Sequence, residues 1–212
     1  MSDWIFITGG AQRIGKAIAE HFHRNNWNVI IHYRNSEKEA IELKQKLNSL
    51  RKNSFEIIKG DLDDNASVEV LCKKVLEISP NLRAVINNAS TFYPKEIFEI
   101  EEEDWSVLIS SNLKAPMFIC KFLGERLKKN TGSIVNITDI YAESGLARYA
   151  TYAAAKAGLL NMTKSLASEL APEVLVNSVA PGVILWDVGN EPDAQKKEEI
   201  LNLLKQLLEW KL

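Results

Sequence analysis

Tyr152 and Lys156 are the residues whose types and spacing first suggest chemistry. They lie four positions apart in a stretch with helical periodicity, Ala150–Leu170, so both side chains should lie on one helix face. An ammonium beside a phenol stabilises the phenolate and lowers the pKa of the phenol, so Tyr152 is expected to donate a proton. The same spacing also occurs by chance on solvated helix edges, so this interpretation depends on the surrounding residues.

A glycine-rich segment could bind phosphate. It runs from Gly9 to Gly15, between a predicted strand and a predicted helix. Glycines allow a tight turn, and a helix N-terminus offers unpaired N–H groups and a partial positive charge to a pyrophosphate. Glycines also form purely structural turns, but this position at the start of a βαβ unit favours a dinucleotide site. The expected contacts are Gly9, Gln12, Arg13, Ile14 and Gly15.

Strands and helices alternate along the chain and would position these groups. The predicted strands are short and rich in Ile and Val: Trp4–Thr8, Asn28–Tyr33, Ser54–Lys59, Leu82–Asn87, Ser133–Thr138 and Val174–Val179. The predicted helices are Arg13–Asn25, Ser36–Leu50, Asn65–Ile78, Glu103–Lys129, Ala150–Leu170 and Ala194–Trp210. This order predicts a single α/β domain, residues 1–212, with a doubly wound parallel sheet (Rossmann) of six strands. Its binding crevice should lie at the carboxyl ends of the strands.

The end of the second predicted strand indicates which dinucleotide is bound. NAD-preferring sites usually place a carboxylate there, whereas this chain has Arg34, Asn35 and Ser36. Because an arginine suits a 2′-phosphate, we expect NADPH (NADP) as cofactor, the alternative being that Arg34 is a solvated loop charge. Asp61, followed by Leu62, is placed to accept a bond from the adenine amino group or, alternatively, to cap the next helix.

Composition excludes several functional classes. The formal net charge is −2, the pI is near 6.0, and 46% of the residues are hydrophobic, so neither a nucleic-acid nor a membrane partner is expected. Cys72 and Cys120 are expected to be free thiols of a cytoplasmic protein. No Cys/His cluster has zinc spacing, so no metal is expected. The histidines, His21, His23 and His32, are expected on helix or strand surfaces.

Two further motifs complete a family pattern. Asn87-Asn88-Ala89 ends the fourth predicted strand, and Pro181-Gly182 follows the sixth. With the glycine loop and Tyr152-x-x-x-Lys156, they resemble the short-chain dehydrogenase/reductase family over about residues 5–182. The resemblance implies that Asn112, a residue in the fifth-strand turn, Tyr152 and Lys156 form a catalytic tetrad. Lys156 would hold the nicotinamide ribose, and Asn112 would support a water. It also implies cofactor contacts from Asn88, Ala89, Ser90, Tyr152, Lys156, Pro181 and Gly182.

One position departs from the family pattern. Thirteen residues before Tyr152, where the family usually has serine, this chain has Asp139. Two like charges about 4 Å apart repel by roughly 4 kcal/mol at an effective dielectric of 20, equivalent to about three pKa units. Asp139 and Tyr152 would therefore not ionise independently, and Asp139 is expected to share or relay a proton. This arrangement suits protonation of a ring nitrogen better than reduction of a simple ketone.

A second departure points to one branch of the family. Ser90 replaces the usual glycine, and the combination of Arg13, Ser90, Phe92 and Asp139 resembles the pteridine reductases. That branch reduces pterins and folates with NADPH. The resemblance implies that Phe92 stacks on the pterin, that Ser90 and Arg13 bind its polar edge and the cofactor phosphates, and that Asp139 and Tyr152 contact the substrate. Alternatively, Phe92 and Tyr93 only pack the loop. Tyr141 is expected to line the substrate pocket.

Three functions are compatible with these observations. The first is an NADPH-dependent reductase of a pterin-like small molecule, and the second is a carbonyl reductase acting on a 3-oxoacyl thioester, which Asp139 and Phe92 disfavour. The third is a shortened, non-catalytic nucleotide-binding protein, because no segment after Gly182 matches the family's usual final strand. The uncovered sheet edge and the helices Glu103–Lys129 and Ala150–Leu170 favour a homo-oligomer, a dimer or tetramer.

Overall fold

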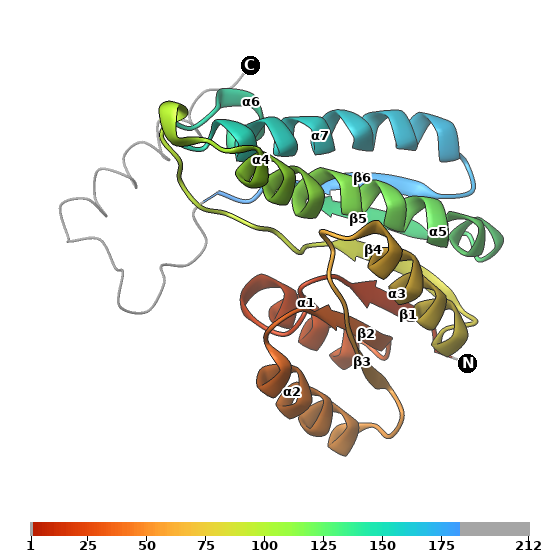
Figure 1. The fold of residues 1–212 in the computed structure, drawn as a ribbon. Coiled ribbons are helices and arrows are strands. Elements are labelled where there is room, and N and C mark those ends of the chain that lie inside the picture. Colours follow the sequence, from red (N-terminus) through yellow and green to blue (C-terminus); the bar gives the residue numbers. More distant parts are fainter. Residues whose placement is uncertain (1, 183–212) are drawn as a thin grey trace. The chain divides into compact units, whose positions relative to one another are not determined.

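Six parallel strands form one sheet in the computed structural model, which describes residues 2–182 (Figure 1). The strand order is β3-β2-β1-β4-β5-β6. Each strand ends within one residue of its predicted bounds: β1 Trp4–Ile7, β2 Asn28–Tyr33, β3 Phe55–Lys59, β4 Leu82–Asn87, β5 Ser133–Ile137 and β6 Leu175–Val179. The predicted doubly wound α/β sheet is therefore confirmed. The predicted helix Ala194–Trp210 and the expected lack of a final strand lie outside the described residues.

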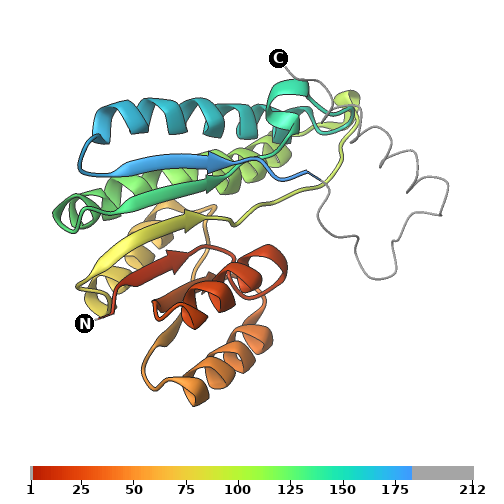
Figure 2. The same cartoon turned by 180° about the vertical axis from the view of Figure 1, so that it is seen from behind.

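Helices cover one face of this sheet and, among the described residues, the other face over β1, β2 and β3, which explains the apolar sequences of those strands. The long helices are α1 Arg13–Arg24, α2 Glu37–Leu50, α3 Asn65–Ile78, α5 Ala115–Lys129 and α7 Ala150–Leu170. Figure 1 looks onto the α3 and α5 side, and Figure 2 onto the α1 and α2 side. Side chains alternate between the faces, so Phe6 packs in the cluster with α3 and α5, whereas Ile5 and Ile7 pack in the cluster with α1 and α2.

The segment after β4 differs from the prediction of one continuous helix over Glu103–Lys129. A 3-10 turn, η1 Ile97–Glu99, comes first, and the helical path is then divided by η2, a π-helical turn at Ser110–Lys114 between α4 Glu102–Ile109 and α5. Pro116 follows this turn and has no N–H to give to the carbonyl of Asn112 four residues earlier. The helical hydrogen bonds therefore shift by one residue here, and the Ala115 N–H donates to the carbonyl of Ser110 five residues earlier.

The structure also tests the expectations for Asp61, the histidines and the cysteines. Asp61 does not cap α3, because Asp64 accepts the N–H groups of Ala66 and Ser67 at 3.3 and 2.8 Å. His23 and His32 are buried rather than on a surface. His23 packs against Ser54, just before β3, and His32 lies between Gly9 and Gly60. The cysteines, Cys72 in α3 and Cys120 in α5, are buried free thiols as expected.

The sheet and its helices lie within one compact unit that ends at Ala180. Pro181 and Gly182 lie outside this unit, so their expected cofactor contacts remain a prediction. Within residues 2–182 no helix is long and apolar enough to cross a bilayer.

Candidate active site

A cavity of about 400 Å³ opens at the carboxyl ends of β1, β2, β3 and β4. Its walls come from the glycine loop, the end of β2, the segment after β3 and the segment after β4. The lining includes most of the predicted cofactor residues: Gly9, Gln12, Arg13, Ile14, Gly15, Arg34, Asn35, Ser36, Leu62, Asn88, Ala89 and Ser90. His32, Asp63, Thr91 and Ser111 line it as well and were not predicted.

The glycine loop is shaped so that side chains at two positions would collide with it. Gly9 has a φ of +62°, a conformation that favours glycine. A Cβ at Gly15 would lie 2.3 Å from the carbonyl oxygen of Gly9, and one at Gly10 would lie 2.4 Å from Ile31 Cγ2. The first turn of α1 has no acidic residue and no side-chain cap, so its N-terminus suits an anion. This cradle fits the pyrophosphate of a dinucleotide.

Asn88 ties the glycine loop to the end of β4. Its Nδ2 donates to the carbonyl oxygens of Thr8 and Gly9, at 2.9 and 3.1 Å. The Thr8 hydroxyl in turn accepts the N–H groups of Asn88 and Ala89, both at 2.9 Å. Asn88 therefore holds one wall of the cavity against another.

Arg34, the predicted NADPH determinant, is already paired in this structure. Its guanidinium lies 3.1 Å from an Asp61 carboxylate oxygen and 2.7 Å from an Asp63 carboxylate oxygen. Because of these ion pairs, Arg34 is not a solvated charge without partners. A 2′-phosphate that bound to Arg34 would have to share its guanidinium with the two carboxylates. Asp61 is not among the residues that line the cavity.

Tyr152 and Asp139 form a direct hydrogen bond on the catalytic side. The Tyr152 hydroxyl donates to a carboxylate oxygen of Asp139 at 2.7 Å. Burial, followed by this bond and the charge of Asp139, raises the pKa of Tyr152 above its usual value. The expectation that Lys156 lowers this pKa is therefore wrong, because its ammonium lies 5.7 Å from the ring centroid and the carboxylate lies at the hydroxyl itself.

Lys156 sits one helical turn beyond Tyr152, on the same face of α7. Its ammonium is buried and donates to the Ile137 carbonyl oxygen at 2.8 Å. Burial lowers the pKa of Lys156 to about 8, although the charge of Asp139 works in the opposite direction. Lys156 therefore loses its proton more readily than an exposed lysine would.

Asn112 lies in the π-helical turn and uses its side chain to hold the segment after β4. Its Nδ2 donates to the carbonyl oxygens of Thr91 and Leu108, at 2.9 and 3.0 Å. Its Oδ1 accepts the hydroxyl of Ser90 at 2.7 Å. Ser90 also opposes the rise in the pKa of Tyr152, so its side chain lies near both predicted catalytic residues.

An aromatic group stands beside Tyr152. The ring of Phe92 is 53% exposed and stacks on Tyr149, with centroids 4.4 Å apart and planes 12° apart. It also meets Tyr152 edge-on at 4.8 Å. The sequence interpretation missed Tyr149, whose signal was its position one helical turn before Tyr152.

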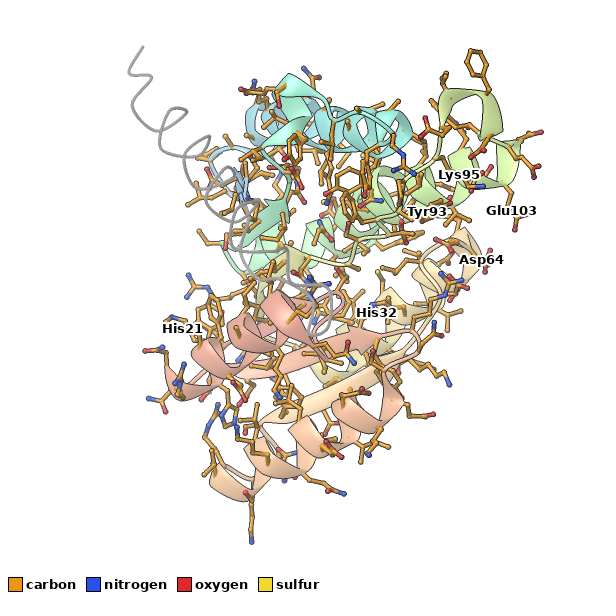
Figure 3. The ribbon with its side chains drawn as sticks, turned by 90° about the vertical axis from the view of Figure 1, so that its left-hand side faces the viewer. His21, His32, Asp64, Tyr93, Lys95 and Glu103 are labelled. Atoms are coloured by element: carbon orange, nitrogen blue, oxygen red, sulfur yellow. The ribbon has the colours of Figure 1, made fainter. Side chains whose placement is uncertain are left out.

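The other tyrosines have structural contacts. Tyr141 is not among the residues that line the cavity; instead its N–H donates to Asp139 at 2.8 Å and orients that carboxylate. Tyr93 donates to Asp104, which also pairs with Lys95 at 3.0 Å, so Tyr93 packs the loop as one alternative expected (Figure 3).

Comparison with known proteins gives a consistent result. The short chain dehydrogenase family matches residues 3–197. The dihydromonapterin reductases of Enterobacter sp. (strain 638) and Shigella boydii serotype 4 (strain Sb227) are each 35% identical, over 201 and 202 residues, covering 93% of this chain and 80% of the relative. The 3-oxoacyl-(acyl-carrier-protein) reductase of Staphylococcus aureus (strain Mu50) is 30% identical over 204 residues, covering 95% of this chain and 82% of the relative.

The predicted family is confirmed, and with it an oxidoreductase that uses a nicotinamide cofactor. The loop after β1, the Tyr152–Lys156 pair on α7 and the family match all agree. The chain therefore belongs to the short-chain dehydrogenase/reductase family.

Proposed function

We propose that this protein is an NADPH-dependent reductase that transfers a hydride to a pterin or dihydropteridine. The observation that carries the proposal is the 2.7 Å hydrogen bond between Tyr152 and Asp139, where the wider family usually has serine. Dihydromonapterin reductases at 35% identity support the same substrate class.

The cofactor would be held by the cavity residues. The glycine loop would take the pyrophosphate at the start of α1, and Arg34 with Asn35 and Ser36 would take the 2′-phosphate. When bound, NADPH supplies the hydride that reduces the C=N bond of the substrate. Lys156 would hold the nicotinamide ribose, and Arg13 and Ser90 would meet the polar edge of the pterin.

The protein side chains would supply the proton. A reduced C=N carbon needs a proton on the adjacent nitrogen, and Tyr152 is buried and protonated at neutral pH. Its hydroxyl would give that proton to the ring nitrogen, and Asp139 would take a proton from solvent and return it to the phenolate along their hydrogen bond. Phe92 would stack on the flat substrate next to Tyr152.

A carbonyl reductase acting on a 3-oxoacyl thioester is the second candidate. It is favoured by the 30% identical Staphylococcus aureus relative. The Asp139 carboxylate argues against it, because a second negative charge would disfavour the anionic oxygen formed in ketone reduction. The third candidate, a nucleotide-binding protein without catalysis, would bind NADPH and reduce nothing.

Activity assays on the purified chain decide among these candidates. NADPH oxidation would be followed with dihydromonapterin, dihydrobiopterin, dihydrofolate and a 3-oxoacyl thioester. Turnover of a pterin supports the proposal, whereas turnover of the thioester alone rejects it. Asp139→Ser sharpens the test, because it should reduce pterin turnover by about tenfold or more and affect ketone reduction less.

We also infer a homo-oligomer, a dimer or tetramer, and a cytoplasmic location. The oligomer is supported by exposed apolar side chains on the two helices that precede and follow η2, Trp105 on α4 and Met117 on α5. The free buried thiols support a reducing compartment. Light scattering after size-exclusion chromatography measures the oligomer, and a monomer at micromolar concentration would reject that inference.

A further inference from the structure

The imidazole of His32, at the end of β2, joins two walls of the dinucleotide cavity. The Gly9 N–H donates to Nδ1 at 3.3 Å, and Nε2 lies 3.2 Å from the Gly60 carbonyl oxygen. The carbonyl of His32 also accepts the Gly10 N–H at 3.0 Å. One residue therefore binds the first two N–H groups of the glycine loop and, on its other side, the end of β3.

These contacts specify one state of the ring. Nδ1 faces an N–H group and must offer a lone pair, whereas Nε2 faces a carbonyl and must carry the hydrogen. Only the neutral Nε2–H tautomer makes both bonds. A protonated imidazole would place an N–H against the Gly9 N–H, with the side chain only 2% exposed and out of reach of compensating water.

Burial keeps the ring neutral, although the bond to the Gly60 carbonyl favours the protonated form. Burial is the largest effect and lowers the pKa of His32 to about 4. Two charged residues act on it: Asp61, after β3, favours the protonated form, and Arg34, after β2, opposes it. The loop after β1 contacts His32 through main-chain N–H groups, those of Gly9 and Gly10.

We propose that His32 is a positioning residue of the cofactor site, which sets the spacing between the phosphate-binding loop and the segment after β3. The proposal rests on the nicotinamide cofactor of the proposed function. Gly60 is followed directly by Asp61, which is expected at the adenine, and by Leu62, which lines the cavity. A ligand that spans from pyrophosphate to adenine must contact both walls, so its affinity depends on the contact that fixes them relative to each other.

Two substitutions separate this role from simple core filling. His32→Asn keeps a hydrogen-bond acceptor near the position of Nδ1 and loses the bond to Gly60. His32→Gln keeps a donor near the position of Nε2 and loses the bond to Gly9. His21→Asn and His21→Gln are matched controls, because His21 is exposed on α1, away from the cavity (Figure 3).

The measurements are the dissociation constant of NADPH by fluorescence titration and the unfolding temperature without cofactor, both on the full chain. His32→Gln should bind NADPH about tenfold more weakly, because it leaves the Gly9 N–H unpaired. His32→Asn should also bind NADPH more weakly, by about threefold to tenfold, because losing the bond to Gly60 also uncouples the two walls, and the His21 variants should not differ from the unmodified protein. Unchanged NADPH affinity in either His32 variant would overturn the proposal.

A spectroscopic test remains decisive if the variants do not fold or NADPH does not bind. In the ¹⁵N-labelled unmodified protein at about pH 6, His32 should show the neutral Nε2–H tautomer, whereas an exposed histidine is largely protonated there. An imidazolium, or the Nδ1–H tautomer, would overturn the proposal. Absence of dinucleotide binding with the expected tautomer would instead reject the cofactor assignment and leave the His32 contact intact.

Discussion

The two halves of the active site are built in different ways. In the dinucleotide cavity the main chain of the glycine loop packs closely, because a Cβ at Gly10 or Gly15 would collide with its neighbours, and Asn88 and His32 bind peptide groups. On the catalytic side, two side chains, Tyr152 and Asp139, bind each other.

This difference has a consequence for substitution. A cavity made of backbone should tolerate almost no change of glycine, whereas the catalytic side should lose chemistry without losing shape. Substitutions should therefore be able to reduce binding and catalysis separately.

Tyr152→Phe should have the largest effect. It removes the proton donor and leaves the ring in place, so turnover should fall by about a thousandfold. The NADPH dissociation constant should change by no more than about twofold, because the cavity does not include Tyr152. Steady-state kinetics and fluorescence titration on the same preparation measure both values. A parallel loss of NADPH affinity would mean that the two halves are not independent.

Gly15→Ala should instead weaken NADPH binding and destabilise the fold. Its Cβ would lie 2.3 Å from the Gly9 carbonyl oxygen and 2.7 Å from Asn88 Nδ2, so the loop must move. We expect a loss of about 3 kcal/mol in the free energy of unfolding and about a hundredfold loss of NADPH affinity. The control is Gly124→Ala in α5, where a Cβ meets nothing within 4 Å and the helix should gain about 0.5–1 kcal/mol. Denaturant titration measures both, and similar effects at the two positions would contradict the close-packed loop.

The sequence was informative wherever local chemistry alone decides the structure. The strands appear as short apolar runs, and their predicted bounds lie within one residue of the observed ones. The π-helical turn was missed because periodicity does not register the missing N–H of Pro116. His32 was placed on a surface, although it lies in the apolar run Asn28–Tyr33, and that run was itself a signal of burial.

Site chemistry that depends on tertiary neighbours could not be predicted. The spacing of Tyr152 and Lys156 places both on one face, but the pKa of Tyr152 is governed by burial and by Asp139, which comes from a different element. Likewise, Arg34 meets Asp63 29 positions later, a contact that requires the arrangement of β2 and β3.

The stability of the fold should depend on pH through its buried histidines. Burial lowers the pKa of His32 from 6.5 to about 4, and burial also lowers that of His23. Because both folded-state pKa values lie below the unfolded ones, both contributions weaken as the pH falls below about 6.5, and that of His32 is lost as the pH falls toward about 4. For His32 the loss is on the order of 3 kcal/mol at most. Urea titrations across this range measure it, and His32→Asn should flatten the profile. An unchanged profile would mean that His32 is not buried in its neutral form.

Substitutions around Arg34 should have the smallest effect, a shift in the preference for NADPH over NADH. The effect is small because the ion pairs of Arg34 are partly exposed. Asp63→Asn removes one carboxylate that competes with a 2′-phosphate for the guanidinium, so NADPH should gain about threefold to tenfold in affinity relative to NADH. Arg34→Asp should shift the preference toward NADH by at least as much, and the gain from Asp63→Asn should shrink at high salt because the interaction is screened. Titration of each variant with both cofactors measures the ratio. Equal affinity for NADPH and NADH in the unmodified protein would show that the carboxylates of Asp61 and Asp63 already cancel the charge of Arg34.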